Sequence, residues 1–496
     1  MWGATRLGMV VLTWMSAWLF MPGPTTQGSL PARWDRWDAG IFTSIAQHWY
    51  FTPGTDPRHV AFFPGFPIAM WLAHLLPWTW TAAGLAVSAV AGAVATVALG
   101  RLAAAEVEEA WARRAGAGAG AAATVPRMRE GLNGAEVEPG AAGSASAGGN
   151  GSAATSLDEG RSGGSASVLG SSSASHAAAA SVGIEGGSAS GSGDGSAASG
   201  SALGSSSASS AAAVGGSAGS AGSASALGSP AAPPKPVPTF LPLTVRAHAH
   251  RAAVNAALFF ALAPAAVFLA AGYSESLFAA FAFSAWAAAR RDRWGPAVVL
   301  AAGASAVRVN GLFLAAAIVL EFLLAGRGRR RWRQAPLLLV PAVPVAAYVV
   351  YLRRDTGDWF AWQHAQAAGW FRTFQTPKAA WDQTWRAAFG ATQAGHTAWI
   401  FQLELVAVVV GLGLTALLLL KRRWPEALYV GLSLLALGTT TWFMSVPRAM
   451  LLWWPLWTML GAWATRRPRV RTLYVCCVAP VMAGVALLFL SGQWAG

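Results

Sequence analysis

The chain has 496 residues, of which 54% are hydrophobic and only 11% are charged, and its mean hydropathy is +0.43. Soluble globular domains carry about 25% charged residues, so this composition excludes a soluble protein and predicts an all-α polytopic membrane protein. The net charge of +14 comes from short basic runs between apolar segments. That placement is typical of cytoplasmic loops and argues against nucleic acid as a partner. The runs are 290–293, 327–333, 421–423 and 466–471.

The apolar segments predict membrane spans along the whole chain. Residues 7–23 predict an uncleaved first transmembrane helix that ends at Pro22-Gly23-Pro24. Since a span needs about 20 apolar residues, the sequence predicts roughly 8 to 11 transmembrane helices. After the first, the expected spans are 61–76, 81–104, 252–271, 273–289, 296–324, 335–352, 397–420, 427–443, 449–465 and 472–491.

One long segment differs from the rest in composition. Residues 115–236 consist almost wholly of Gly, Ala and Ser. Such a sequence lacks the apolar side chains that offset the entropy of ordering, so we expect a disordered linker. It divides the chain into an N-terminal membrane part, 1–114, and a C-terminal multi-span part, 237–496. The N-terminal part includes a candidate catalytic loop at 24–67.

This loop is polar and aromatic, and it contains Asp35 and Asp38. Residues 38–50 have the period of an amphipathic helix that lies on a membrane surface. Asp38 stands at the expected N-cap, where a carboxylate accepts backbone N–H bonds. Asp38 could therefore be a helix cap alone, or a base that the cap holds in place. The apolar face would consist of Ile41, Phe42, Ile45 and Trp49.

Four sequence blocks occur in a characteristic order. They are RWDAGIFTSIAQHWY at 36–50, AFFPGFP at 61–67, FLAAGYSESLF at 268–278 and VRVNGL at 307–312. Together they resemble the PIG-V family of GPI mannosyltransferases. Two other segments, 355–366 and Ser445-Val446-Pro447-Arg448, are similar to actinobacterial members in particular.

The resemblance implies a membrane glycosyltransferase of GT-C type. Such an enzyme would move mannose, in α-1,6 linkage, from dolichol- or polyprenyl-phosphate mannose to a lipid-linked glycan acceptor. The reaction would belong to GPI-anchor biosynthesis or to a bacterial counterpart. The active site would face the non-cytoplasmic side of the bacterial plasma membrane or, alternatively, of the endoplasmic reticulum membrane. Membrane lipid would be a further partner.

The expected chemistry needs few groups. An inverting transfer requires one carboxylate to deprotonate the acceptor hydroxyl, and Asp38 is our candidate, with Asp35 as a second carboxylate. The lipid-phosphate donor is a co-substrate, so we expect no cofactor and no metal. Arginine can hold a phosphate bidentately, and Arg308 and Arg448 are candidates, with Arg372 a weaker one. The family blocks add His48, Tyr50, Glu275 and Asn310 as substrate-binding candidates.

Each candidate also has a purely structural alternative. Glu275 and Arg308 could simply pair with each other inside the membrane. Arg448 could extend to the membrane interface, and His48 could only cover the polar face of its helix.

The aromatic residues leave two further alternatives open. Phe62-Phe63-Pro64 could be a wedge that enters the membrane rather than a substrate contact. A second aromatic loop, near Trp359 and Trp370, could meet the first.

A transporter or lipid flippase without transferase activity is the alternative function. It would explain the spans and the intramembrane Glu275, and it predicts corresponding interrupted helices in two halves of the chain. The sequence shows no internal repeat, and transport does not require the aspartate loop.

Overall fold

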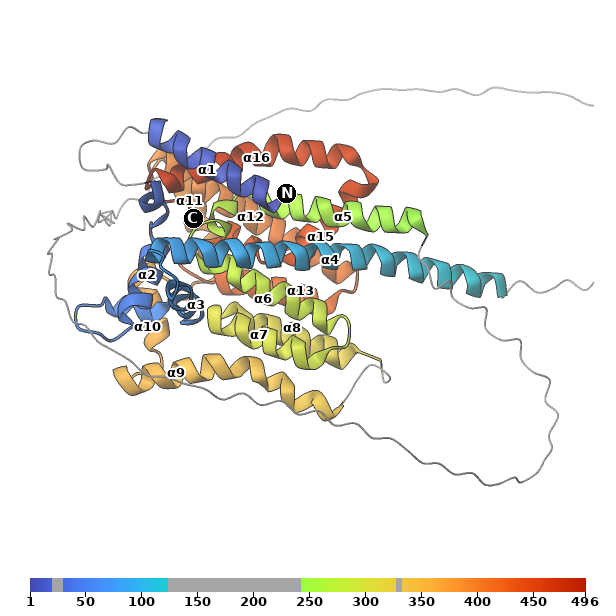
Figure 1. The fold of residues 1–496 in the computed structure, drawn as a ribbon, viewed down its shortest axis with the longest axis horizontal. Helices are drawn as coiled ribbons and strands as arrows, with labels where there is room; N and C mark the ends of the chain where they lie inside the picture. The colour runs from blue at the N-terminus through green and yellow to red at the C-terminus, as the bar shows by residue number, and fades with distance from the viewer. Residues whose placement is uncertain (20–29, 124–241, 327–331) are drawn as a thin grey trace, which may run out of the picture. The chain divides into compact units, whose positions relative to one another are not determined.

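The computed structural model describes residues 1–19, 30–123, 242–326 and 332–496, and these form one all-α unit (Figure 1). The predicted linker lies outside the described residues from 124 onward. Its predicted start at 115 is wrong, because α4 continues to Ala123. The first helix ends at Leu19, and the expected stop at Pro22 lies outside the described residues.

The N-terminal part contains four α-helices and two short 3₁₀ helices. They are α1 (Trp2–Leu19), η1 (Leu30–Trp34), α2 (Asp38–His48), η2 (Pro57–Ala61), α3 (Gly65–His74) and α4 (Trp80–Ala123). The first half of the C-terminal part contains α5 (Leu243–Ala261), η3 (Ala266–Leu269), α6 (Ser274–Ala289), α7 (Trp294–Val307), α8 (Asn310–Leu324), η4 (Trp332–Ala342) and α9 (Val343–Thr356). The remaining helices are α10 (Ala361–Trp370), α11 (Pro377–Phe389), α12 (Gly395–Leu420), α13 (Trp424–Gly438), α14 (Val446–Met450), α15 (Trp454–Arg466) and α16 (Pro468–Leu490).

Four helical segments in the described part of the chain are long and apolar enough to cross a membrane, which confirms an all-α polytopic membrane protein. They are Trp80–Ala115, Trp332–Thr356, Gly395–Leu420 and Pro468–Leu490. Several predicted spans are wrong. The span at 61–76 is reduced to the ten residues of α3, and the helix in 252–271 ends at Ala261. The spans at 296–324 and 449–465 are each divided, into α7 and α8 and into α14 and α15. The total of roughly 8 to 11 spans stays a prediction.

The helices place the basic runs and the aspartate loop at opposite ends of α4. α2 and α3 pack against α4, and Gly84 lies near its beginning, next to Gly272. Farther along α4, Glu109 binds Arg290 and Glu106 binds Arg423, so two basic runs meet there. At about 1.5 Å per residue, Gly84 and Glu106 are roughly 33 Å apart along the helix axis. That separation matches the thickness of a bilayer core, about 30 Å.

Glycine permits the close approach of two of the sequence blocks. A Cβ at Gly65 would lie 2.6 Å from the carbonyl oxygen of Ala306, at the end of α7. A Cβ at Gly311 would lie 2.3 Å from the backbone nitrogen of Ser305. Neither space admits a larger residue without a backbone shift. Gly65 therefore brings the start of α3 against the end of α7, and Gly311 brings the start of α8 against the same end.

The helix after the aspartates differs from the prediction in two respects. It ends at His48 instead of residue 50, so the exposed Trp49 lies outside it, and the rest of its apolar face packs inside the protein rather than on a membrane surface. Phe42 makes edge contacts with Phe62 and Phe66, at centroid distances of 5.1 and 5.0 Å, and Ile45 is fully buried. Aromatic side chains that follow in the chain cover this face. The amphipathic pattern of α2 therefore arises from packing inside the protein and not from contact with a membrane surface.

Candidate active site

Four charged side chains from distant parts of the chain meet at helix ends. Arg448 Nη2 lies 2.9 Å from Asp38 Oδ2 and 2.7 Å from Glu275 Oε1. Arg448 Nε also donates to Glu275 Oε1, at 2.8 Å. Arg308 Nη1 lies 2.7 Å from the same Glu275 oxygen. The sequence candidates Asp38, Glu275, Arg308 and Arg448 thus form one ion-pair network.

The network is graded from the interior to the surface. The side chain of Glu275 is 0% exposed and that of Arg448 is 9% exposed, whereas those of Asp38 and Arg308 are 15% and 24% exposed. Arg448 therefore does not extend to the membrane interface, and that alternative is wrong. The Glu275–Arg308 pair exists as proposed. Both members keep further contacts, since Arg308 also donates to Ser274 Oγ.

Two aromatic side chains of the FLAAGYSESLF block, 268–278, pack around Arg448. The Arg448 guanidinium carbon lies 4.6 Å from the ring centroid of Phe268 and 4.9 Å from that of Tyr273. Such contacts stabilise a cation that has lost much of its water. The Tyr273 hydroxyl donates to the carbonyl oxygen of Arg36, two residues before Asp38. The block thereby ties the aspartate loop to α6.

Asp38 is not the N-cap of its helix. Trp37 occupies that position, with φ of 53°, and no side-chain cap bond forms. Asp38 is the first helical residue, and its carboxylate turns to Arg448 instead. Asp35 accepts a weak hydrogen bond from Thr43, at 3.5 Å. Burial raises the pKa of the Asp35 carboxyl above its usual value.

A residue that the sequence analysis missed holds the short helix of Arg448. Glu404, fully buried in α12, accepts hydrogen bonds from the backbone nitrogens of Ser445 and Val446, at 2.7 and 2.8 Å. These two residues begin α14, and Ser445 has a φ of 67°. A lone carboxylate inside an apolar span is costly and points to a function. That signal was present within 397–420.

We expect Glu404→Gln to lower the transfer rate about tenfold while the protein remains folded. Glutamine has one acceptor oxygen and an NH2 group that would face a backbone N–H, so one of the two bonds is lost and α14 shifts. Steady-state kinetics should show the loss mainly in kcat. Gln402→Ala, on the same helix, serves as the control. A wild-type kcat in Glu404→Gln would show that α14 does not depend on this bond.

Arg372 is a third cation at this site. It follows α10, in a loop that pairs with the segment after α13: the backbone nitrogen of Gln375 donates to Thr439, at 2.8 Å. Burial, together with the positive charges of Arg308 and Arg448, lowers the pKa of Arg372 to about 10. Asp38 and Glu404 act in the opposite direction. Arg372 therefore lies within electrostatic range of Asp38, Arg308 and Arg448.

Three other candidates have different positions. His48 is exposed at the end of α2, as the alternative for it predicted. Tyr50 is buried, and its hydroxyl donates to the carbonyl oxygen of Phe62. Asn310 begins α8, two residues after Arg308, and is partly exposed. It remains a candidate.

The two aromatic loops meet, as predicted. Phe62 contacts Trp370 at a centroid distance of 5.0 Å. The carbonyl oxygen of Ala61 accepts from both Trp362 Nε1 and Gln366 Nε2, each at 3.0 Å. Because Phe63 is buried against Tyr348, these residues do not form a membrane-entry wedge.

Two other aspartates lie at the end of α9. Asp355 is exposed in its last turn, and Asp358, after the helix, pairs with His364 at 2.7 Å. Among the described residues, no group of three or more His, Cys, Asp or Glu side chains is arranged to hold a metal ion.

Comparison with known proteins confirms the predicted resemblance to the PIG-V family. Residues 241–325 match the family model described as Mannosyltransferase (PIG-V). The chain is 48% identical over 82 residues to GPI alpha-1,6-mannosyltransferase 2 of Mus musculus, covering 16% of each chain. It is 52% identical over 65 residues to the Homo sapiens protein of the same name, covering 13% of each. No solved structure matches this chain significantly.

The match covers only part of these proteins and only part of the site. The chain aligns with 13–16% of the length of these two relatives. Residues 241–325 include Glu275 and Arg308, whereas Asp38, Arg372 and Arg448 lie outside that range. The ion pairs described above therefore connect the matched segment to the rest of the site.

Proposed function

We propose that this protein is a membrane mannosyltransferase that takes mannose from a dolichol- or polyprenyl-phosphate donor. The acceptor would be a lipid-linked glycan, with α-1,6 linkage as in the named relatives. The observation that carries the proposal is the partly exposed Asp38 carboxylate held 2.9 Å from Arg448, in a network that includes Glu275 and Arg308 of the PIG-V segment.

Asp38 is the proposed general base. Its carboxylate is held at the start of α2, and it is more accessible than Glu275. A single carboxylate of this kind can accept the proton of an acceptor hydroxyl while the phosphate leaves. The oxygen of that hydroxyl then forms the new bond to the sugar. Arg448 orients the base, because two of its nitrogens are committed to Asp38 and Glu275.

Arg308 and Arg372 are the proposed ligands of the donor phosphate. Arg308 is the most exposed cation of the ion-pair network, and Arg372 adds a second charge nearby. Fixed cations in a site that excludes water stabilise the charge that develops on a leaving phosphate. This differs from the expectation that Arg448 holds the phosphate, since Arg448 is nearly buried.

Transfer assays with defined donors test the function. Membranes that contain the protein should incorporate labelled mannose from polyprenyl-phosphate mannose into a lipid-linked product, and matched membranes without it should not. A nucleotide-linked mannose should not replace the lipid donor once endogenous donor synthesis is blocked. Movement of labelled donor across the bilayer without any new glycosidic bond would instead establish the flippase alternative.

We expect Arg308→Lys and Arg372→Lys to raise the KM for the donor about tenfold each. Lysine keeps the charge but loses the planar fork that binds phosphate bidentately. Arg354→Lys, an exposed arginine at the end of α9, serves as the control. Donor KM values unchanged in both variants would contradict phosphate binding by these residues. Loss of stable protein in Arg308→Lys alone would mean that its pairing with Glu275 is mainly structural.

A further inference from the structure

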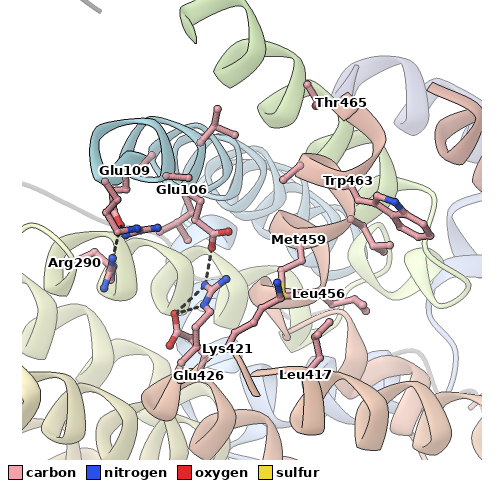
Figure 2. A pocket seen from close by; sticks show the side chains of 18 of the residues that line it. Glu106, Glu109, Arg290, Leu417, Lys421, Glu426, Leu456, Met459, Trp463 and Thr465 are labelled. Atoms are coloured by element: carbon pink, nitrogen blue, oxygen red, sulfur yellow. Dashed lines mark hydrogen bonds and ion pairs between the residues drawn. The ribbon is translucent and has the colours of Figure 1, made fainter. Parts of the chain in front are cut away.

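A second charged cluster lies at the other end of α4, far from Asp38. Glu109 pairs with Arg290 at 2.6 Å, and Glu106 pairs with Arg423 at 2.7 Å. Arg423 also lies 2.8 Å from Glu426 (Figure 2). The proposed transfer reaction uses none of these residues. They join α4 to the ends of α6, α12 and α13.

These ion pairs border a cavity of about 1260 Å³, between α4, α5, α6, α8, α12, α13 and α15. Seven arginine or lysine side chains and four glutamates line it. Each glutamate pairs with Arg290 or Arg423. Four of the cations make no ion pair within the described part of the chain, so the cavity has an excess of positive charge. They are Arg114, Lys421, Arg422 and Arg466.

The wall of the cavity along α12 and α15 is apolar and partly exposed. Val410, Leu417 and Trp463 line it, and they are 37%, 40% and 51% exposed. Leu456 and Met459 extend the same wall along α15 (Figure 2). In a membrane protein, exposed apolar side chains next to spanning helices face lipid. Leu417 lies one turn before Lys421, and Trp463 lies three residues before Arg466. The cavity therefore offers cations at the ends of α12 and α15 and hydrocarbon contacts next to them along the same helices.

We propose that this cavity binds an anionic phospholipid from the leaflet on the side of the basic loops. The phosphate would contact Lys421, Arg422 and Arg466, and an acyl chain would lie along Leu417, Met459 and Trp463. Basic pockets between transmembrane helices on the cytoplasmic side suit anionic headgroups of this kind. A free phosphate would leave the apolar wall without a partner, so the charge and the apolar lining together favour a lipid.

Lipid titration of the detergent-purified full chain, followed by native mass spectrometry, tests the proposal. Wild-type protein should retain phosphatidylglycerol in preference to phosphatidylcholine. The triple variant Lys421→Gln/Arg422→Gln/Arg466→Gln should bind phosphatidylglycerol with an affinity at least about tenfold lower, because each basic residue near the headgroup contributes to binding. The matched control is Arg467→Gln/Arg469→Gln/Arg471→Gln, which removes three exposed arginines that do not line the cavity.

The control variant separates a site from general surface attraction. It should retain phosphatidylglycerol within about twofold of the wild type, since only the cavity residues are expected to contact the phosphate. The proposal would be overturned if both triple variants bound phosphatidylglycerol equally weakly, or if neither bound it more weakly than the wild type. Inorganic phosphate should not displace the lipid, and displacement by phosphate alone would indicate an ion site instead.

A measurement on the wild-type protein does not depend on the variants. Phosphatidylglycerol with a photoactivatable acyl chain should label peptides of α12 and α15 that include Leu417, Met459 or Trp463. Labels confined to Val299 and Leu323, which are exposed apolar residues outside the cavity lining, would contradict the site.

Discussion

Asp38→Asn should lower the rate of mannose transfer by about 100-fold or more, the range expected when a general base is removed. Asparagine has nearly the same shape, and Arg448 keeps its two contacts to Glu275, so the fold should persist. The measurement is the initial rate with labelled polyprenyl-phosphate mannose, together with the apparent melting temperature in detergent. Near-normal turnover would reduce Asp38 to a partner of Arg448.

Asp35→Asn is the matched control for this experiment. Burial raises the pKa of Asp35 in the folded protein above its value in the unfolded chain. Asp35 therefore favours folding when it is protonated, and the free energy of unfolding decreases as the pH rises from the unfolded-state pKa through the raised one. A neutral asparagine should therefore be tolerated at neutral pH, with transfer within a few-fold of the wild type. If Asp35→Asn proved the more damaging variant, Asp35 would be the base.

Glu275→Gln should have the largest effect on stability. One oxygen of this fully buried carboxylate binds both Arg308 and Arg448, so its loss leaves two arginines short of countercharge. Removing one partner of a buried ion pair costs about 3–5 kcal/mol. We expect a marked decrease in apparent melting temperature and in the yield of folded protein, measured by size-exclusion chromatography and thermal unfolding.

Two further variants determine whether charge balance is the cause. Asp355→Asn removes an exposed carboxylate and should change stability by less than about 0.5 kcal/mol. Glu275→Gln/Arg308→Gln removes one charge of each sign and should recover part of the melting temperature without recovering transfer. No recovery in the double variant would mean that Glu275 stabilises the fold by packing rather than by charge.

Much of this site could be predicted from the chain, because ionisable residues in apolar segments are rare. Glu275 and Arg308 stand out for that reason, and so does Glu404, although the sequence analysis passed over it. Arg448 was a candidate for binding the donor phosphate, which requires an accessible guanidinium, yet the side chain of Arg448 is only 9% exposed. The burial of Tyr50 was not predictable, because a buried hydroxyl that binds a backbone carbonyl has the same sequence context as a substrate contact.

The helix pattern was less reliable where helices break. The apolar run 296–324 has no proline near Arg308, and the sequence analysis passed over Asn310-Gly311, a local turn signal at the break. That break leaves α7 and α8 shorter than a span. The break depends on Gly311 approaching Ser305 and on Gly65 approaching Ala306. Likewise, the apolar face of α2 predicts that these residues are buried, but it does not predict which segment covers them. In the structure, the loop around Phe62 covers this face.

The sequence alone was sufficient to predict that this protein is helical, that it lies in a membrane and that charged residues stand within its apolar segments. A bilayer requires about 20 apolar residues per span and makes every buried charge costly, so both features appear in local composition. Only the tertiary structure decided which charges meet. Asp38 and Arg448 are 410 residues apart in sequence, and no local pattern specifies such a pairing. It arises because a buried charge without a partner is costly in a low-dielectric interior, so the helices pack with Glu275 and Asp38 facing Arg448.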